Sequence, residues 1–225
     1  MMLDFIRIAC AVPDVAVANV EQNAQELCKY IAQADGQGVD LLVFPELSLT
    51  GASCGDLFFE DALHAAVKKG LRTVAECCFE HPEVTVVVGF PLRLGMQVFN
   101  CAAVIYDGCV SGIAAKTKLT GEEKRWFASG ENVVVKGIFA STLGLDDIYG
   151  PKAANYEIPM NCSMHCFGEV DALASVGVVF GTDLAAPDSD ASVLALQGAE
   201  VIVSLAAEPE VSSASAGTWQ PQRRQ

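Results

Sequence analysis

The sequence predicts an α/β fold in which a mixed β-sheet carries helices on one face and is doubled into a layered sandwich. Three observations support this. A strand, a helix and a second strand open the chain, the order of a right-handed βαβ unit with parallel strands. Asp107-Gly108 separates two apolar runs and is typical of a tight hairpin, so antiparallel pairing is expected as well. The 225 residues are 52% hydrophobic, enough for one sizeable core.

The first part of the chain alternates between strand-like runs and segments with helical spacing of apolar residues. Pro45 marks the end of the second strand, because proline cannot donate a ladder hydrogen bond. Gly55 lies in a turn that also caps the following helix. The predicted elements are a strand over Phe5–Cys10, a helix over residues 17–34, a strand over residues 38–43, and a helix from the Cys54-Gly55-Asp56 turn through about Phe79.

The remaining chain is mostly strand-like. Val84–Phe90 is rich in β-branched residues and predicts a central strand. A helix is predicted from about Ser189 to Gly198, and residues 145–169, which carry Gly, Pro and Asn, predict a loop or an insert. The other predicted strands are Val98–Tyr106, Val110–Ala114, Val133–Phe139, Leu173–Phe180 and Glu200–Ala206.

Composition excludes several classes of function. The formal net charge of −14 argues against nucleic acid and anionic membrane surfaces as partners. No run of 18 apolar residues is present, so no transmembrane helix is expected, and no basic region precedes an apolar run as in a secretory signal. The nine cysteines are odd in number and dispersed, which favours a reducing cytoplasm over a disulfide framework.

Two charged side chains follow predicted strands directly. Glu46 comes at the carboxyl end of its strand, where open α/β sheets place their ligand crevices. Lys116 follows the strand that ends at Ala114, where an ammonium group could stabilise an oxyanion or tune a thiol. On placement alone, Glu46 could instead cap the next segment and Lys116 could be a solvated surface residue.

Several segments carry a recognisable pattern in a fixed order over nearly the whole chain: Phe44-Pro45-Glu46-Leu47-Ser48-Leu49-Thr50-Gly51 with Cys54-Gly55-Asp56-Leu57-Phe58, Ala115-Lys116-Thr117 with Glu123-Lys124-Arg125-Trp126-Phe127, Val176-Gly177-Val178 through Asp183-Leu184, and Ala195 through Ala207. The pattern resembles the nitrilase (carbon–nitrogen hydrolase) superfamily, and more narrowly the glutaminase domain of glutamine-dependent NAD+ synthetase. The resemblance implies a nitrilase-like α-β-β-α sandwich with mixed sheets. It also implies a single domain over residues 1–225 that is incomplete, or truncated, at its C-terminus.

The family works with a Glu–Lys–Cys triad and no cofactor. By resemblance, Glu46 would be the general base and Lys116 would stabilise the tetrahedral intermediate while the cysteine attacks the amide of glutamine and ammonia leaves. The cysteine is expected between Phe180 and Asp183, where this chain has Gly181. Glycine carries no nucleophile, so the chain is expected to be inactive or impaired.

Further site residues follow from the same resemblance. The segment between Leu119 and Lys124 is shorter than expected for the family, and Glu122 or Glu123 could replace an acidic residue of the glutamine pocket. Thr182 stands where the family usually has glutamate. Its hydroxyl is a much poorer nucleophile than a thiolate, so it is assigned to the substrate pocket.

The implied partners are glutamine or another small amide, a second copy of the chain in a homo-oligomer, and an ATP-dependent NAD synthetase domain or separate chain. No metal site is expected. Cys162 and Cys166 flank His165 but supply too few ligands for a structural site. The alternative function is a nitrilase-like module that has lost chemistry and persists for binding or oligomerisation.

Overall fold

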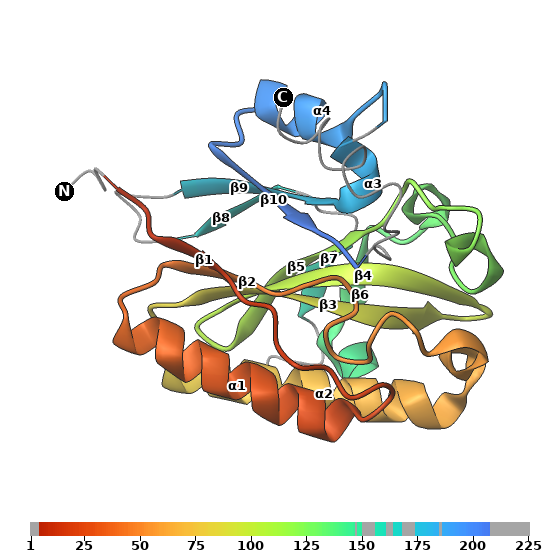
Figure 1. Ribbon diagram of the computed structural model, residues 1–225, viewed down its shortest axis with the longest axis horizontal. Helices are drawn as coiled ribbons and strands as arrows, with labels where there is room; N and C mark the ends of the chain where they lie inside the picture. Colours follow the sequence, from red (N-terminus) through yellow and green to blue (C-terminus); the bar gives the residue numbers. More distant parts are fainter. Residues whose placement is uncertain are drawn as a thin grey trace, which may run out of the picture.

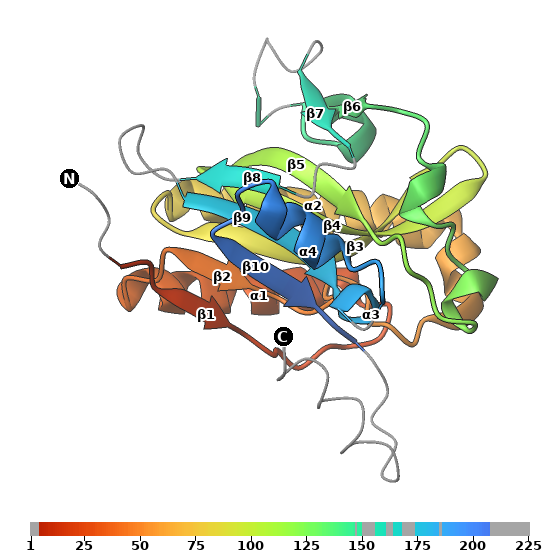
Figure 2. The ribbon, with the colours of Figure 1, turned by 90° about the horizontal axis from the view of Figure 1, so that it is seen from above.

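The computed structural model describes residues 5–146, 148–149, 156–160, 164–167, 174–184 and 186–207. Two helices, a large sheet, a smaller sheet and two short helices are stacked in that order (Figure 1). Seen from above, α4 lies over the smaller sheet, which in turn lies over the larger one (Figure 2). This arrangement confirms the predicted α-β-β-α sandwich.

The larger sheet has five strands in the order β1-β2-β3-β4-β5 and is mixed, as predicted. The first three strands are parallel, and β3, β4 and β5 are antiparallel. The β4–β5 hairpin turns at Asp107 and Gly108, whose φ values of 47° and 71° are those of a tight primed turn. The strands are β1 (Ile8–Cys10), β2 (Leu41–Val43), β3 (Thr85–Leu94), β4 (Gln97–Tyr106) and β5 (Cys109–Ala115).

The outer layer on one face of this sheet consists of α1 (Val20–Gly36) and α2 (Asp61–Glu80). Asn19 caps α1, and its side chain accepts a hydrogen bond from the amide of Gln22. The predicted helix after residue 54 is divided in the structure. A 3₁₀ turn, η1 (Gly55–Phe59), comes first, and α2 starts only after Glu60, whose backbone is extended.

The smaller sheet has the order β10-β9-β8, with β9 parallel to β10 and antiparallel to β8. Its elements and those that cover it are β8 (Met164–Phe167), β9 (Ala174–Phe180), α3 (Gly181–Leu184), α4 (Asp190–Leu196) and β10 (Val201–Leu205). An apolar core joins the two sheets and includes Leu41, Val87, Val104, Val178, Phe180 and Leu205. The inner face of each sheet therefore sits against the other.

Two predictions between residues 133 and 169 were wrong in part. The strand predicted over Val133–Phe139 forms only at β6 (Gly137–Phe139), and Val134 is 95% exposed. β-Branched residues favour a strand only where they can pack, and Val134 contacts no core. The predicted loop at 145–169 contains β8 and also β7 (Glu157–Pro159), which pairs with β6.

Three further 3₁₀ turns complete the described elements: η2 (Glu123–Arg125), η3 (Gly130–Asn132) and η4 (Ala140–Leu143). Of the helices in the described residues, none is both long and apolar enough to cross a membrane.

Candidate active site

Glu46 lies in the loop that follows β2, as the sequence predicts. The loop packs directly on β3 at Gly89, where a Cβ atom would lie only 2.4 Å from the Leu47 amide nitrogen and 2.5 Å from the Pro45 carbonyl oxygen. Glycine is therefore required at this close approach. Leu47 has a φ of 54°, a strained conformation for leucine, and its carbonyl accepts hydrogen bonds from Thr50 and Gly51. These contacts fix the direction of the neighbouring Glu46 side chain.

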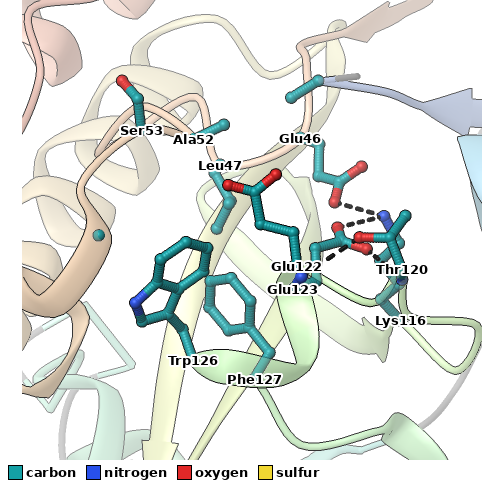
Figure 3. A pocket seen from close by; sticks show the side chains of 12 residues that line it. Glu46, Leu47, Ala52, Ser53, Lys116, Thr120, Glu122, Glu123, Trp126 and Phe127 are labelled. Carbon is teal, nitrogen blue, oxygen red and sulfur yellow. Dashed lines mark hydrogen bonds and ion pairs between the residues drawn. The ribbon is translucent and has the colours of Figure 1, made fainter. Parts of the chain in front are cut away.

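Lys116 follows β5, and its side chain is only 1% exposed. Its Nζ atom lies 2.8 Å from Glu46 Oε1 and 2.6 Å from Glu123 Oε1, so one ammonium group pairs with two carboxylates (Figure 3). Glu123 is held by η2, and its second oxygen accepts a hydrogen bond of 2.8 Å from the Thr120 amide. A buried charge needs such partners, because desolvation otherwise disfavours it strongly.

Asn100 on β4 is a site residue that sequence reasoning missed. Its Nδ2 atom donates a hydrogen bond to Glu46 Oε1, and its backbone carbonyl accepts one of 2.8 Å from the amide of Lys116. The fully buried Oδ1 atom of Asn100 has no hydrogen-bond partner. The sequence does contain a signal that could have identified Asn100: it is a polar residue inside an otherwise apolar predicted strand. A buried amide usually hydrogen-bonds to a specific partner.

The three charged groups shift one another's pKa values. Burial raises the pKa of Glu46 to about 7, although the adjacent Lys116 opposes that shift. Burial alone would lower the pKa of Lys116, but the Glu46 and Glu123 carboxylates outweigh it and raise that pKa. Burial acts to raise the pKa of Glu123, yet hydrogen bonds from Lys116 and Thr120 leave it lowered. Glu46 is thus suited to exchange a proton near neutral pH.

A cavity of about 340 Å³ opens above these groups. In Figure 3 the Glu122 side chain extends into the space between Glu46 and the rings of Trp126 and Phe127. The cavity is lined by Glu46, Leu47, Ala52, Ser53, Gly55, Lys116, Thr120, Glu122, Glu123, Trp126, Phe127 and Ala207. An apolar wall with a few convergent charged groups is the usual form of a small-molecule site.

The Cys54-Gly55-Asp56-Leu57-Phe58 segment supports the aromatic wall of this cavity. Asp56 Oδ1 accepts a hydrogen bond of 3.1 Å from Trp126 Nε1. The ring of Phe58 is fully buried, with its centroid 4.7 Å from that of Phe127. The Cys54 thiol is buried and donates to the Thr50 carbonyl at 3.1 Å, so it serves packing.

Gly181 is buried at the start of α3. It directly follows Phe180, whose ring centroid lies 6.0 Å from Lys116 Nζ, so the turn after β9 is close to the ammonium group. Asp183 Oδ2 accepts a hydrogen bond of 2.9 Å from the Phe180 amide and fixes that turn. Gly181 is not among the residues that line the cavity, and its assignment as the nucleophile position stays a prediction.

Thr182 and Lys118 face each other away from the cavity lining. The Thr182 hydroxyl donates a hydrogen bond of 2.6 Å to the backbone carbonyl of Lys118, and Thr182 is not a lining residue. The Lys118 Nζ atom pairs with Asp188 at 2.7 Å. Lys116 is therefore the lysine that reaches Glu46.

Among the described residues, no group of three or more His, Cys, Asp and Glu side chains could hold a metal ion. Cys162 and the side chain of Cys166, the pair weighed as metal ligands, lie outside the described part of the structure.

Glu46→Gln should change the pH dependence of stability. In the unfolded chain the carboxyl has its ordinary pKa of 4.5, whereas the folded protein holds the proton up to about 7. Between these values the unfolded state binds fewer protons, so the Glu46 contribution to stability falls as pH rises. Glutamine cannot ionise, and the variant should gain on the order of 1–3 kcal/mol over wild type across this window. Urea unfolding at a series of pH values measures the difference.

A matched control for that experiment is Glu131→Gln, which removes an exposed carboxylate outside the cavity. Its stability curve should run parallel to that of the wild type. Parallel curves for Glu46→Gln and wild type would contradict the raised pKa of Glu46.

Comparison with known proteins is consistent with this geometry. The profile of the carbon–nitrogen hydrolase family matches residues 7–225. A glutamine-dependent NAD(+) synthetase of Mycobacterium leprae (strain TN) is 28% identical over 210 residues, which cover 91% of this chain and 28% of that protein. One from Xylella fastidiosa (strain Temecula1 / ATCC 700964) is 33% identical over 158 residues, 66% of this chain and 28% of that protein.

Solved structures share the fold. A glutamine-dependent NAD(+) synthetase from Cytophaga hutchinsonii superposes with a TM-score of 0.70 at 22% identity, covering 94% of this chain and 32% of that one. An amidase from Nesterenkonia sp. gives a TM-score of 0.72 at 18% identity, covering 97% and 71%. The chain spans 28% of the length of the first curated relatives. On the strength of the family match, this chain belongs to the carbon–nitrogen hydrolase family.

Proposed function

We propose that residues 1–225 are a glutaminase-type domain, related to that of glutamine-dependent NAD+ synthetase, that binds glutamine or another small amide and turns it over very slowly or not at all. The observation that carries the proposal is the buried ion pair of Glu46 and Lys116 at the cavity of about 340 Å³. An acid with a pKa of about 7 beside a fixed ammonium group is the arrangement that acyl transfer from an amide needs.

In the proposed reaction of the family, Glu46 accepts the proton of a thiol, and the thiolate attacks the amide carbon. Lys116 stabilises the oxyanion that forms, and the proton held by Glu46 passes to the leaving ammonia. Water then hydrolyses the thioester. Gly181, at the proposed nucleophile position, offers no atom to form the first bond, and the Thr182 hydroxyl is engaged with the Lys118 carbonyl. Amide binding is then retained while covalent turnover is lost, as in a pseudoenzyme.

The two neighbouring glutamates have different tasks in this proposal. Both oxygens of Glu123 have partners, in Lys116 and Thr120, so Glu123 positions the ammonium group rather than contacting substrate. The Glu122 side chain extends into the cavity (Figure 3) and is suited to the α-ammonium group of an amino acid amide. Thr182 would act through the Lys118 backbone, beside the cavity rather than in it.

Glutamine should stabilise the protein without being consumed. At a glutamine concentration 100 times Kd, binding adds about 2.7 kcal/mol, which corresponds to a rise in Tm of roughly 5–10 °C. Scanning fluorimetry measures the shift, and a coupled assay measures ammonia.

Glu122→Gln should weaken binding about tenfold through loss of a charge-assisted hydrogen bond, whereas Glu131→Gln should leave Kd unchanged. Ammonia release by the wild type at an ordinary enzymatic rate would contradict the proposed inactivity, and no Tm shift would contradict amide binding.

The second candidate function is a module that binds or oligomerises without amide chemistry. The outer face of α4 favours it, because Val193 is 50% and Leu196 90% exposed. A second copy of this chain, the expected partner of nitrilase-like domains, would cover these side chains. Light scattering of the purified chain distinguishes the possibilities, and a monomer at high concentration would argue against self-association. We further propose that an ATP-dependent NAD synthetase domain or chain is the ammonia acceptor and that the protein is cytoplasmic.

A further inference from the structure

Two cysteines face each other between the helices of the outer layer, where α1 and α2 lie side by side (Figure 1). Cys28 belongs to α1 and Cys77 to α2. The Cys77 Sγ atom lies 3.8 Å from the Cys28 carbonyl oxygen, and the Cys28 Sγ atom lies 3.9 Å from the Thr73 carbonyl oxygen on α2. The two thiols also lie close enough to shift each other's pKa values. Each sulfur is therefore already next to the other helix.

We propose that Cys28 and Cys77 are a redox-modification site, at which a low-molecular-weight disulfide such as glutathione disulfide converts the thiol pair into a reversible cross-link between α1 and α2. This site lies on α1 and α2, and neither cysteine lines the cavity of the proposed function. In the described residues the cysteines are free thiols, so this structure represents the reduced form.

Solvent access distinguishes Cys28 and Cys77 from Cys78 and Cys101. Cys28 and Cys77 are partly exposed, so a small disulfide can reach them. Cys78, the neighbour of Cys77, is fully buried against the core, and burial raises the pKa of its thiol. Cys101 is also fully buried, in β4. A buried neutral thiol is a poor attacking group, so among these four cysteines exchange is expected at Cys28 and Cys77.

The two thiols shift each other's pKa in opposite directions. The interaction with Cys28 lowers the pKa of Cys77 against the opposing effect of burial, and nearby His81 adds to the lowering. The same interaction raises the pKa of Cys28, with burial as a further cause. Cys77 is thus the better thiolate and the expected first attacker.

The thiol–disulfide exchange with glutathione disulfide proceeds in two steps. The Cys77 thiolate attacks one sulfur of glutathione disulfide, a Cys77–glutathione disulfide forms, and one glutathione thiolate leaves. Cys28 then loses its proton to solvent and attacks the Cys77 sulfur, which releases the second glutathione thiolate. Two protein thiols are oxidised, and one glutathione disulfide is reduced to two glutathione molecules. The result links residues separated by 49 positions in the chain.

Closing a loop of this length restricts the unfolded chain and should raise Tm by about 5–10 °C. After incubation of the full chain with glutathione disulfide and quenching with an alkylating agent, intact mass should show two fewer alkyl groups than the reduced control, because the cross-link has removed both thiol hydrogens. Peptide mapping should place the bond between Cys28 and Cys77, and dithiothreitol should reverse both changes.

Single substitutions make the test specific. Cys28→Ser should stop at a Cys77–glutathione adduct, and Cys77→Ser should form no adduct at Cys28 at a comparable rate. Cys10→Ser, which removes an exposed thiol on β1, should still form the cross-link. The proposal is overturned if glutathione remains on Cys77 of the wild type without exchange, or if Cys28 and Cys77 both stay open to alkylation while other cysteines oxidise.

Discussion

Gly181→Cys is expected to raise the rate of ammonia release from glutamine by on the order of 10³-fold or more over the wild type. Removing the nucleophile from a hydrolase can lower kcat by about 10⁶-fold, and restoring one should recover part of that difference. The backbone at residue 181 is helical, so cysteine there needs no unusual backbone conformation. Steady-state ammonia assays with glutamine give the comparison.

Two controls show whether such activity uses the proposed groups. Gly181→Ser adds a hydroxyl in place of the thiol and should remain nearly inactive, since an alcohol is a weaker nucleophile than a thiolate. Combining Gly181→Cys with Glu46→Gln should remove most of the gain, because the thiol then lacks its base. A folded Gly181→Cys protein that binds glutamine but releases no ammonia would contradict the assignment of residue 181.

Lys116→Met should destabilise the protein by about 3–5 kcal/mol. The substitution leaves the carboxylates of Glu46 and Glu123 near each other in a buried site without the ammonium group that pairs with both. Removing one partner of a buried ion pair is strongly unfavourable, because the remaining charge stays desolvated. Urea unfolding at neutral pH measures the loss.

Lys118→Met is the matched control, since it removes a lysine two positions away whose carboxylate partner Asp188 is 75% exposed. It should change stability far less than Lys116→Met does. Adding Glu46→Gln to Lys116→Met should recover part of the loss, because one uncompensated carboxylate is then neutral. Equal losses for the two lysine variants would show that the Lys116 pair is not a buried ionic interaction.

The positions of Glu46 and Lys116 could be predicted because each charged residue directly follows an apolar run. Their approach to 2.8 Å could not, since β2 and β5 are separated in the sheet by β3 and β4. That distance depends on strand order, which local sequence does not encode. Asn100 on β4 hydrogen-bonds to both residues, and it becomes visible only once the sheet is assembled.

The short strands β6 and β7 could not be predicted from local sequence. β6 and β7 have three residues each, too few for a period-two pattern to stand out from a loop. They form because they pair with each other across a long stretch of chain, with Ile138 opposite Ile158, both buried. The Asp107-Gly108 hairpin, by contrast, is a local signal and was predicted correctly.

Glu46 and Lys116 face a cavity, and we propose that Gly181 occupies the position of the family's attacking sulfur. Intact mass after treatment with a diazo-ketone analogue of glutamine tests this assignment, because such a reagent bonds to an activated thiol in the pocket. One adduct on Gly181→Cys, mapped to position 181 and suppressed by excess glutamine, is the predicted result, with none on the wild type despite its nine cysteines. A glutamine-protected adduct on the wild type, or none on the folded variant, would show that residue 181 is not the nucleophile position.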